Sequence, residues 1–231
     1  MNALRRWLWR LIGVALVAGL VFAFFRAGEL LDRFAPFELD RPPNLLTPIH
    51  LLLFRRDPDR CFAALDGGRI GYERAPDRPL ENGCGYDHAA LLTRSNVAYG
   101  GGVLLRCPAL VSLILWERHV VEPAAKQELG RRITSMRQLG TYSCRNINHA
   151  AFGRRSQHAL AKAIDIASFR TDEGTVISIA RDWSDAGSRG KFLHAVRDGA
   201  CRFFGVVLSP DYNALHHDHL HLDTSVWSVC R

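Results

Sequence analysis

Two separate segments of the chain carry the residue types that bind a divalent metal ion. The downstream segment, residues 216–221, reads His-His-Asp-His-Leu-His and holds four of the ten histidines. The upstream segment contains His158, which is followed seven residues later by Asp165. Imidazole and carboxylate groups are ligands of zinc, and a catalytic zinc site combines three protein ligands with one position for water. Together the two segments could supply such a set.

The spacing of these residues restricts how they can meet. Alternate residues of a strand share a face, so His219 and His221 can point to one site from one strand. His158 and Asp165 cannot both bind one ion from a single regular element. A helix would separate them by about 10.5 Å along its axis, and a strand would turn them to opposite faces. We therefore expect the chain to fold back between them and to place them on neighbouring segments.

The pattern from Cys61 onward predicts an α+β fold with a small, largely antiparallel sheet and helices packed on it. Helices are predicted at residues 109–129, where Pro123 should kink or split the helix, and at residues 190–201. Strands are predicted at residues 132–142, 163–169, 175–179, 203–208 and 220–226. We expect this sheet to carry the metal ligands.

The N-terminus predicts a membrane anchor. Residues 7–25 are apolar except for Arg10 and reach the length of about 20 residues that a spanning helix needs. A cleaved signal peptide is the alternative, but bulky Phe24 and Phe25 stand where a cleavage site needs small residues. Basic residues before the apolar run favour a cytoplasmic N-terminus. Residues 1–26 are therefore expected to form one transmembrane helix, with the rest of the chain exported. In a bacterial cell this would place the helix in the inner membrane and the rest of the chain in the periplasm.

The remainder divides into a linker and a domain. Residues 27–60 contain several prolines and are expected to form a juxtamembrane linker, whose apolar run at 49–54 docks on the domain. Residues 61–231 are long enough for one compact domain with a core. Six dispersed cysteines in an exported chain indicate disulfides. The sequence does not choose among the possible pairings of Cys61, Cys84, Cys107, Cys144, Cys201 and Cys230.

The charge of the chain argues against a nucleic-acid partner. The formal net charge is +7, and no run of lysine and arginine is longer than two residues. The chain therefore lacks the basic footprint of a nucleic-acid-binding domain. A mildly basic exported domain suits anionic envelope polymers and acidic peptide termini.

The two metal-binding segments resemble a known motif pair. Ser156-x-His158-x6-Asp165 followed by His219-x-His221 is similar to the pair found in the LAS group of zinc peptidases, which includes lysostaphin-type enzymes, D-alanyl-D-alanine peptidases and hedgehog-like domains. More closely, the chain from Cys107 onward resembles the extensin-like C-terminal domain family of bacterial proteins. The segments that carry this resemblance are Tyr-Ser-Cys-Arg at 142–145, Ser-Gln-His at 156–158, Ala-Ile-Asp-Ile at 163–166, Val-Leu-Ser-Pro at 207–210 and Asp-His-Leu-His-Leu-Asp at 218–223.

The resemblance implies a peptidase that acts on peptidoglycan peptides with one zinc ion, bound by His158, Asp165 and His221. Either His219 or Asp218 would be the general base. His219 shares a strand face with His221, whereas Asp218 would point away from the site unless the segment is bent. The mechanism would be amide hydrolysis by a metal-activated water. Neither the residues nor the resemblance distinguishes an endopeptidase from a carboxypeptidase.

Several other residues are candidates for secondary roles. Arg145 and Arg154 could bind a peptide carboxylate, because a guanidinium pairs with a carboxylate in a bidentate way. Ser156 could hydrogen-bond near the site. Asp223 is expected to be a structural carboxylate or to hydrogen-bond to a ligand rather than bind the ion, and His216 and His217 are expected to flank the site or face the substrate. One departure from the D-alanyl-D-alanine peptidases is Ala161, since these enzymes usually carry glycine at that position and glycine eases a turn with positive φ.

Two other functions use the same residues. One is a non-catalytic cell-wall binding module that the metal stabilises, and the other is a hydrolase with a non-peptide target. A fourth protein ligand, such as His219 beside His221, would close the site and favour the binding module.

Overall fold

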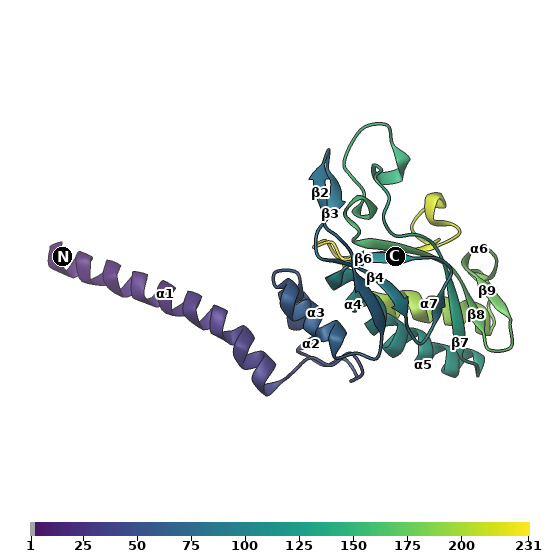
Figure 1. Ribbon diagram of the computed structural model, residues 1–231, viewed down its shortest axis with the longest axis horizontal. Helices are drawn as coiled ribbons and strands as arrows, with labels where there is room; N and C mark the ends of the chain where they lie inside the picture. The colour runs from purple at the N-terminus through teal and green to yellow at the C-terminus, as the bar shows by residue number, and fades with distance from the viewer. Residues whose placement is uncertain (1–2) are drawn as a thin grey trace. The chain divides into compact units, whose positions relative to one another are not determined.

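The computed structural model describes residues 3–231 and contains two compact units. The first unit ends at Phe37 and contains helix α1 (Ala3–Phe34). The second unit, Glu38–Arg231, contains every described strand and the remaining described helices (Figure 1).

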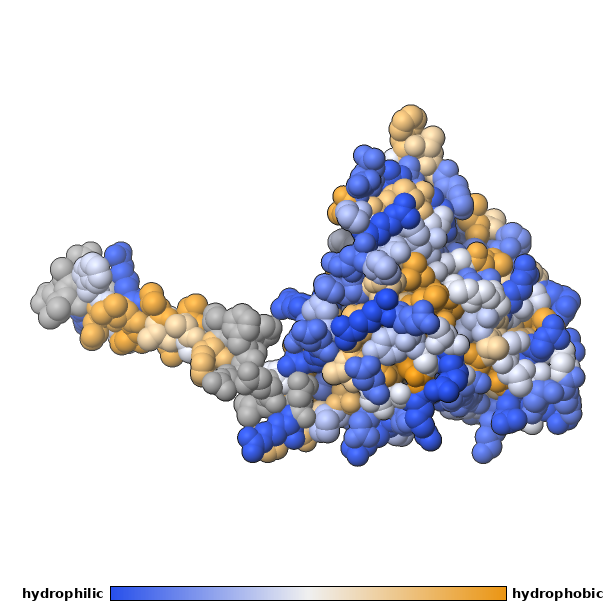
Figure 2. All heavy atoms as spheres, viewed as in Figure 1, coloured by the Kyte–Doolittle hydropathy of each residue, from blue (hydrophilic) through white to orange (hydrophobic). Residues whose placement is uncertain are grey.

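The prediction of a transmembrane helix at the N-terminus is wrong. Residues 7–25 lie within α1, but no helix among the described residues is long and apolar enough to cross a membrane. Arg10 places a charge within this apolar run. Apolar side chains such as Trp7 and Leu16 are exposed on α1, and Figure 2 shows apolar surface along this helix.

The prediction of an α+β fold with largely antiparallel pairing is confirmed. In the described residues, the largest sheet has seven strands in the order β12-β10-β11-β8-β7-β5, with β9 paired to β8. Its pairs are antiparallel except β5–β7 and β10–β12. Its strands are β5 (Ala98–Tyr99), β7 (Ile133–Gly140), β8 (Ala163–Thr171), β9 (Val176–Ser178), β10 (Val206–Leu208), β11 (Leu220–Asp223) and β12 (Val229–Cys230).

Two smaller sheets and the helices complete the second unit. One sheet joins β1 (Gly71–Arg74), β4 (Ala89–Arg94) and β6 (Val103–Arg106), and the other joins β2 (Arg78–Glu81) and β3 (Cys84–Tyr86). The α-helices are α2 (Thr47–Phe54), α3 (Pro58–Asp66), α4 (Cys107–Trp116), α5 (Glu122–Ala124), α6 (Ile179–Asp182) and α7 (Ser188–Ala200). Short 3-10 helices are η3 (Ile147–His149), η4 (Gln157–Leu160) and η5 (Ala214–His216).

Helices cover one face of the large sheet. Helix α4 is buried on all sides, and the indole of its Trp116 donates a hydrogen bond to the Val196 carbonyl of α7 at 2.8 Å. The ring of Phe169, on β8, lies 6.1 Å from the Trp116 ring and 5.1 Å from that of Phe192 on α7. A bulge at Ala167 keeps Phe169 on the core face, because the register of β8 against β7 shifts by one residue there. The opposite face of the sheet carries Asp165.

Pro123 is accommodated without ending the predicted helix. The helix continues from α4 through the π-helical turns η1 (Glu117–Val121) and η2 (Ala125–Leu129), with α5 between them. Proline lacks an N–H and its ring clashes with the preceding turn, and the wider π turn gives that ring room. Gly130 ends the helix with a left-handed φ of 64°.

The compact unit begins at Glu38 rather than at Cys61. Residues 38–60, which we expected to form part of a linker, contain α2 and the start of α3. Leu39 and Phe54 are buried, so this segment contributes to the core of the domain. The prolines that argued for a linker stand at helix starts, where proline is tolerated: Pro48 in α2 and Pro58 in α3.

All six cysteines form disulfides, as predicted. The pairs among the described residues are Cys61–Cys107, Cys84–Cys144 and Cys201–Cys230. The first joins α3 to α4, the second joins β3 to the loop after β7, and the third joins the end of α7 to β12. Each cross-link removes conformational freedom from the unfolded chain.

The double variant Cys201→Ser/Cys230→Ser is expected to lose about 3 kcal/mol of stability, because this pair closes a loop across 29 residues of sequence. Thermal denaturation should show a midpoint lower by about 10 °C. Unchanged denaturation of the double variant, with both thiols free, would contradict the assigned pairing.

Candidate metal centre

Asp165 and His221 meet because their strands are neighbours in the sheet. β8 and β11 pair antiparallel, and His221 stands directly opposite Asp165. Directly opposed residues of an antiparallel pair point to the same face. His221 Nδ1 lies 2.8 Å from Asp165 Oδ1, and both side chains are largely buried. Leu220 and Leu222 alternate with His221 and are fully buried in the core behind it.

His158 reaches the same point from η4, a separate short segment. Its Nε2 lies 3.1 Å from Asp165 Oδ2 and 3.2 Å from His221 Nδ1. The chain reverses between His158 and Asp165 at Ala161, which has the left-handed conformation with φ 50° and ψ 37°. The expected fold-back is therefore made without glycine, at a cost of about 1–2 kcal/mol for a residue with a Cβ.

The outer nitrogen of each imidazole is held by an oxygen. His158 Nδ1 lies 2.8 Å from the Thr141 carbonyl, and His221 Nε2 lies 3.1 Å from Asp223 Oδ2. A carbonyl oxygen only accepts, so His158 donates its Nδ1 proton to Thr141, and Nε2 is the nitrogen that faces the cluster. Asp223 likewise accepts a hydrogen bond from His221 Nε2, so Nδ1 is the nitrogen of His221 that faces the cluster. Such outer partners orient the histidine ligands of metal sites.

Hydrogen bonds within the cluster shift the pKa values of Asp165 and His221 in opposite directions. Burial alone would raise the pKa of Asp165, but hydrogen bonds from His158 and His221 outweigh it and hold the pKa far below its usual range. Burial alone would lower the pKa of His221, but its hydrogen bonds to Asp165 and Asp223 raise it to about 9. The ion-free site therefore carries a proton on His221 at neutral pH, and this proton occupies the lone pair that a metal would use.

The two candidate bases have different positions. His219 is largely buried, with Nε2 3.8 Å from Asp165 Oδ1, so it lies beside the cluster. Asp218 is about half exposed and its Oδ1 lies 2.8 Å from His219 Nδ1. The carboxylate therefore holds the Nδ1 proton of His219 and turns Nε2 toward the centre. Hydrogen bonding to His219 is the main cause that lowers the pKa of Asp218.

His216 belongs to the site, although the sequence interpretation placed it beside the site. It is buried, and its ring lies 5.2 Å from that of His219 and 6.1 Å from that of His221. Nδ1 lies 2.8 Å from Asn213 Oδ1. Burial, and then repulsion by His219 and His221, lower its pKa to about 4, so the ring is neutral at pH 7. The position of His216 depends on η5, which ends at this residue and returns its ring to the centre.

The three expected substrate-binding residues lie in different surroundings. Arg145 is at the centre, with Nη2 3.6 Å from Asp165 Oδ2. Ser156 is buried and accepts a hydrogen bond from the His158 N–H, so it caps η4 and orients His158. Arg154 is exposed, and none of its described contacts reaches the cluster.

The donor set fits a divalent ion. Donor atoms of His158, Asp165 and His221 all lie within 4.8 Å of one another, which is the only such group found among the described residues. Both imidazoles turn one ring nitrogen inward, and the carboxylate lies between them. Two nitrogens and one carboxylate form a common zinc ligand set that leaves one position open. No cysteine is available to the site, since all are in disulfides.

Comparison with known proteins gives one result. Residues 59–231 match the family described as Extensin-like protein C-terminus. The comparison with curated proteins and the comparison with solved structures find no match.

Ala161→Val should destabilise the protein more than Ala159→Val. Both alanines are fully buried, so both substitutions over-pack the core, but only position 161 has positive φ. A β-branched residue is strongly disfavoured there. We expect the first variant to be less stable than the second by about 1–2 kcal/mol in urea denaturation. Equal losses would show that the left-handed turn carries no strain.

The metal-free protein should lose stability as the pH rises from 6.5 to 9. The pKa of His221 is raised to about 9 in the folded state, so protonation stabilises the fold fully below pH 6.5, and this stabilisation is lost as the pH passes 9. We expect a fall of about 3 kcal/mol in the free energy of unfolding over this interval. His221→Gln removes the group, and an equally steep pH dependence in this variant would contradict the assignment.

Proposed function

The chain belongs to the extensin-like family, and we propose that it is a metal-dependent peptidase acting on cell-wall peptides. The observation that carries this proposal is the convergence of His158, Asp165 and His221, with a fourth histidine, His219, beside them and oriented by a carboxylate. The motif pair similar to that of the LAS zinc peptidases supports the reaction class and the substrate. The family match supports neither directly, since it assigns only the family.

The chain's own residues define what the site would hold and do. His158 Nε2, His221 Nδ1 and the Asp165 carboxylate would bind the ion, and zinc suits this donor set. A bound divalent ion supplies Lewis acidity, which polarises an amide carbonyl and acidifies water. The hydrogen bonds from His158 Nδ1 to Thr141 and from His221 Nε2 to Asp223 keep both imidazoles in the orientation that metal binding needs.

His219 is the proposed general base. Its Nδ1 proton is held by Asp218, so the Nε2 lone pair is free to take a proton from the attacking water and return it to the leaving amine. Asp218 is then a positioning residue, because it acts through His219. His216 is neutral and packs against His219, so it adds no positive charge next to the base.

Substrate would approach on the open face of the sheet. A hollow of about 560 Å³ extends from Asp218 across β7, β8 and β9 and is lined by Arg137 and Arg170. These cations and Arg145 suit peptides that carry free carboxylates, as cell-wall stem peptides do. The disulfides support an oxidising, exported location such as the periplasm.

The test measures metal content and peptide release together. The zinc-loaded full-length chain is incubated with purified peptidoglycan, and new amino termini are counted. His219→Gln should retain one ion but lower the rate about a hundredfold or more, since it removes proton transfer. His217→Gln is the matched control, because His217 is the exposed neighbour with its Nδ1 on the Ala214 carbonyl, and it should act as wild type.

Two outcomes would contradict the proposed peptidase activity. The wild-type chain could bind one ion and the polymer but release no termini, which is the behaviour of a metal-stabilised binding module. His219→Gln could lose the ion, which would make His219 a fourth ligand that closes the site. The 3.8 Å between His219 Nε2 and Asp165 Oδ1 makes this the alternative to exclude.

A further inference from the structure

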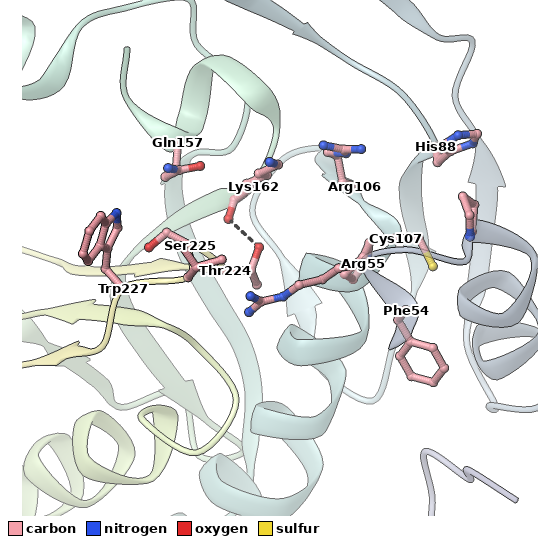
Figure 3. A pocket seen from close by; sticks show the side chains of 13 residues that line it. Phe54, Arg55, His88, Arg106, Cys107, Gln157, Lys162, Thr224, Ser225 and Trp227 are labelled. Atoms are coloured by element: carbon pink, nitrogen blue, oxygen red, sulfur yellow. Dashed lines mark hydrogen bonds between the residues drawn. The ribbon is translucent and has the colours of Figure 1, made fainter. Parts of the chain in front are cut away.

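A second hollow, of about 340 Å³, lies apart from the candidate metal centre. Its walls come from segments far apart in sequence: the end of α2, the junction of β6 and α4, residue Lys162 before β8, and the residues that follow β11 (Figure 3). None of the three proposed metal ligands lines it. It is therefore a separate concavity on the same domain.

Positive charge is in excess around this hollow. Arg55, Arg106 and Lys162 all line it. Arg106 is paired with the Asp87 carboxylate. Within the described part of the chain, neither Arg55 nor the Lys162 ammonium has an ion pair.

The carboxylates that attract these cations, Asp87 and Asp223, already have other partners, and Asp87 is paired with Arg106. Asp223 is buried and already accepts hydrogen bonds from His221 and from the Ser225 N–H. Burial lowers the pKa of Lys162, and repulsion by Arg106 lowers it further. Three cations face two carboxylates that already have other partners, so positive charge remains in excess and an anion in the hollow would be stabilised.

The other wall of the hollow is apolar. Phe54 is buried at its base, whereas Val226 and Trp227 are 82% and 66% exposed at its rim. An exposed indole beside a cationic pocket offers a flat surface for an apolar group. The hollow therefore combines a place for an anion with a surface for the body that carries it.

The walls are held in place by covalent and hydrogen-bonded links. Cys107, which lines the hollow, is joined to Cys61 of α3, and this link fixes the α2–α3 segment against α4. The Lys162 carbonyl accepts hydrogen bonds from the Thr224 N–H at 3.2 Å and from Thr224 Oγ1 at 3.5 Å, the latter drawn in Figure 3. The backbone segments that carry Lys162 and Arg106 are thus held in place before any ligand arrives.

We propose that this hollow is a binding site for an organic anion, a carboxylate or phosphate group attached to an apolar or aromatic body. The anionic group lies among Lys162, Arg55 and Arg106, and the body lies against Trp227. The site does not depend on the metal or on peptidase activity.

Isothermal titration calorimetry on the full-length chain, after metal removal by dialysis, tests the site. The probes are N-acetylphenylalaninate and phenyl phosphate, with N-acetylphenylalaninamide as the neutral counterpart of the first. Saturable binding of at least one anion is expected, and the amide should bind at least about tenfold more weakly, since it lacks the charge-assisted hydrogen bonds. Comparing the two anions shows whether the site takes a carboxylate or a phosphate.

Three variants test whether the anion binds in this hollow. Lys162→Gln should raise the Kd about tenfold, and Trp227→Ala, an exposed position whose loss leaves the core intact, about fivefold. Lys191→Gln, a change of the same type at an exposed lysine on α7, should leave the Kd unchanged. Binding of neither anion, equal binding of the amide, or wild-type affinity in both Lys162→Gln and Trp227→Ala would overturn the proposal.

Discussion

The arrangement of this domain depends on the placement of one buried carboxylate between two imidazoles. A buried charge is costly unless it is paired and hydrogen-bonded. Asp165 lies on the central strand of the large sheet with His221 opposite it and His158 beside it, so the carboxylate is compensated from both sides. In the ion-free protein a proton on His221 balances the charge. A divalent ion would replace that proton, which links metal binding to the proton held there.

The same constraint explains which parts of the site the sequence could predict. Alternation along a strand placed His219 and His221 on one face, and the spacing of His158 and Asp165 required a reversal of the chain, which Ala161 makes. The role of His216 could not be read in this way, because it depends on η5 returning the ring to the centre. The resemblance had marked position 161 as one where glycine is usual, and the structure shows that alanine adopts the left-handed conformation there.

Other parts of the fold depend on contacts that no local pattern contains. Prolines in residues 38–60 resemble those of a linker, yet Pro48 and Pro58 begin helices whose apolar faces bury Leu51 and Phe62. The apolar run in α1 has the composition of an anchor, but no described helix has the length and apolarity to cross a membrane. The disulfide pairing follows from the tertiary fold: it brings β3 to the loop that carries Arg145, and α3 to the wall of the second hollow.

X-ray absorption spectroscopy on the zinc-loaded full-length chain tests the central claim most directly. The account predicts one ion with four nitrogen or oxygen neighbours at about 2.0–2.2 Å, two of them imidazoles and one a solvent oxygen. Asp165→Asn and His158→Gln should each remove stoichiometric binding. A spectrum with three or more imidazoles, or binding that survives both substitutions, would show that the ion is held elsewhere or in a closed site, and the account would fail.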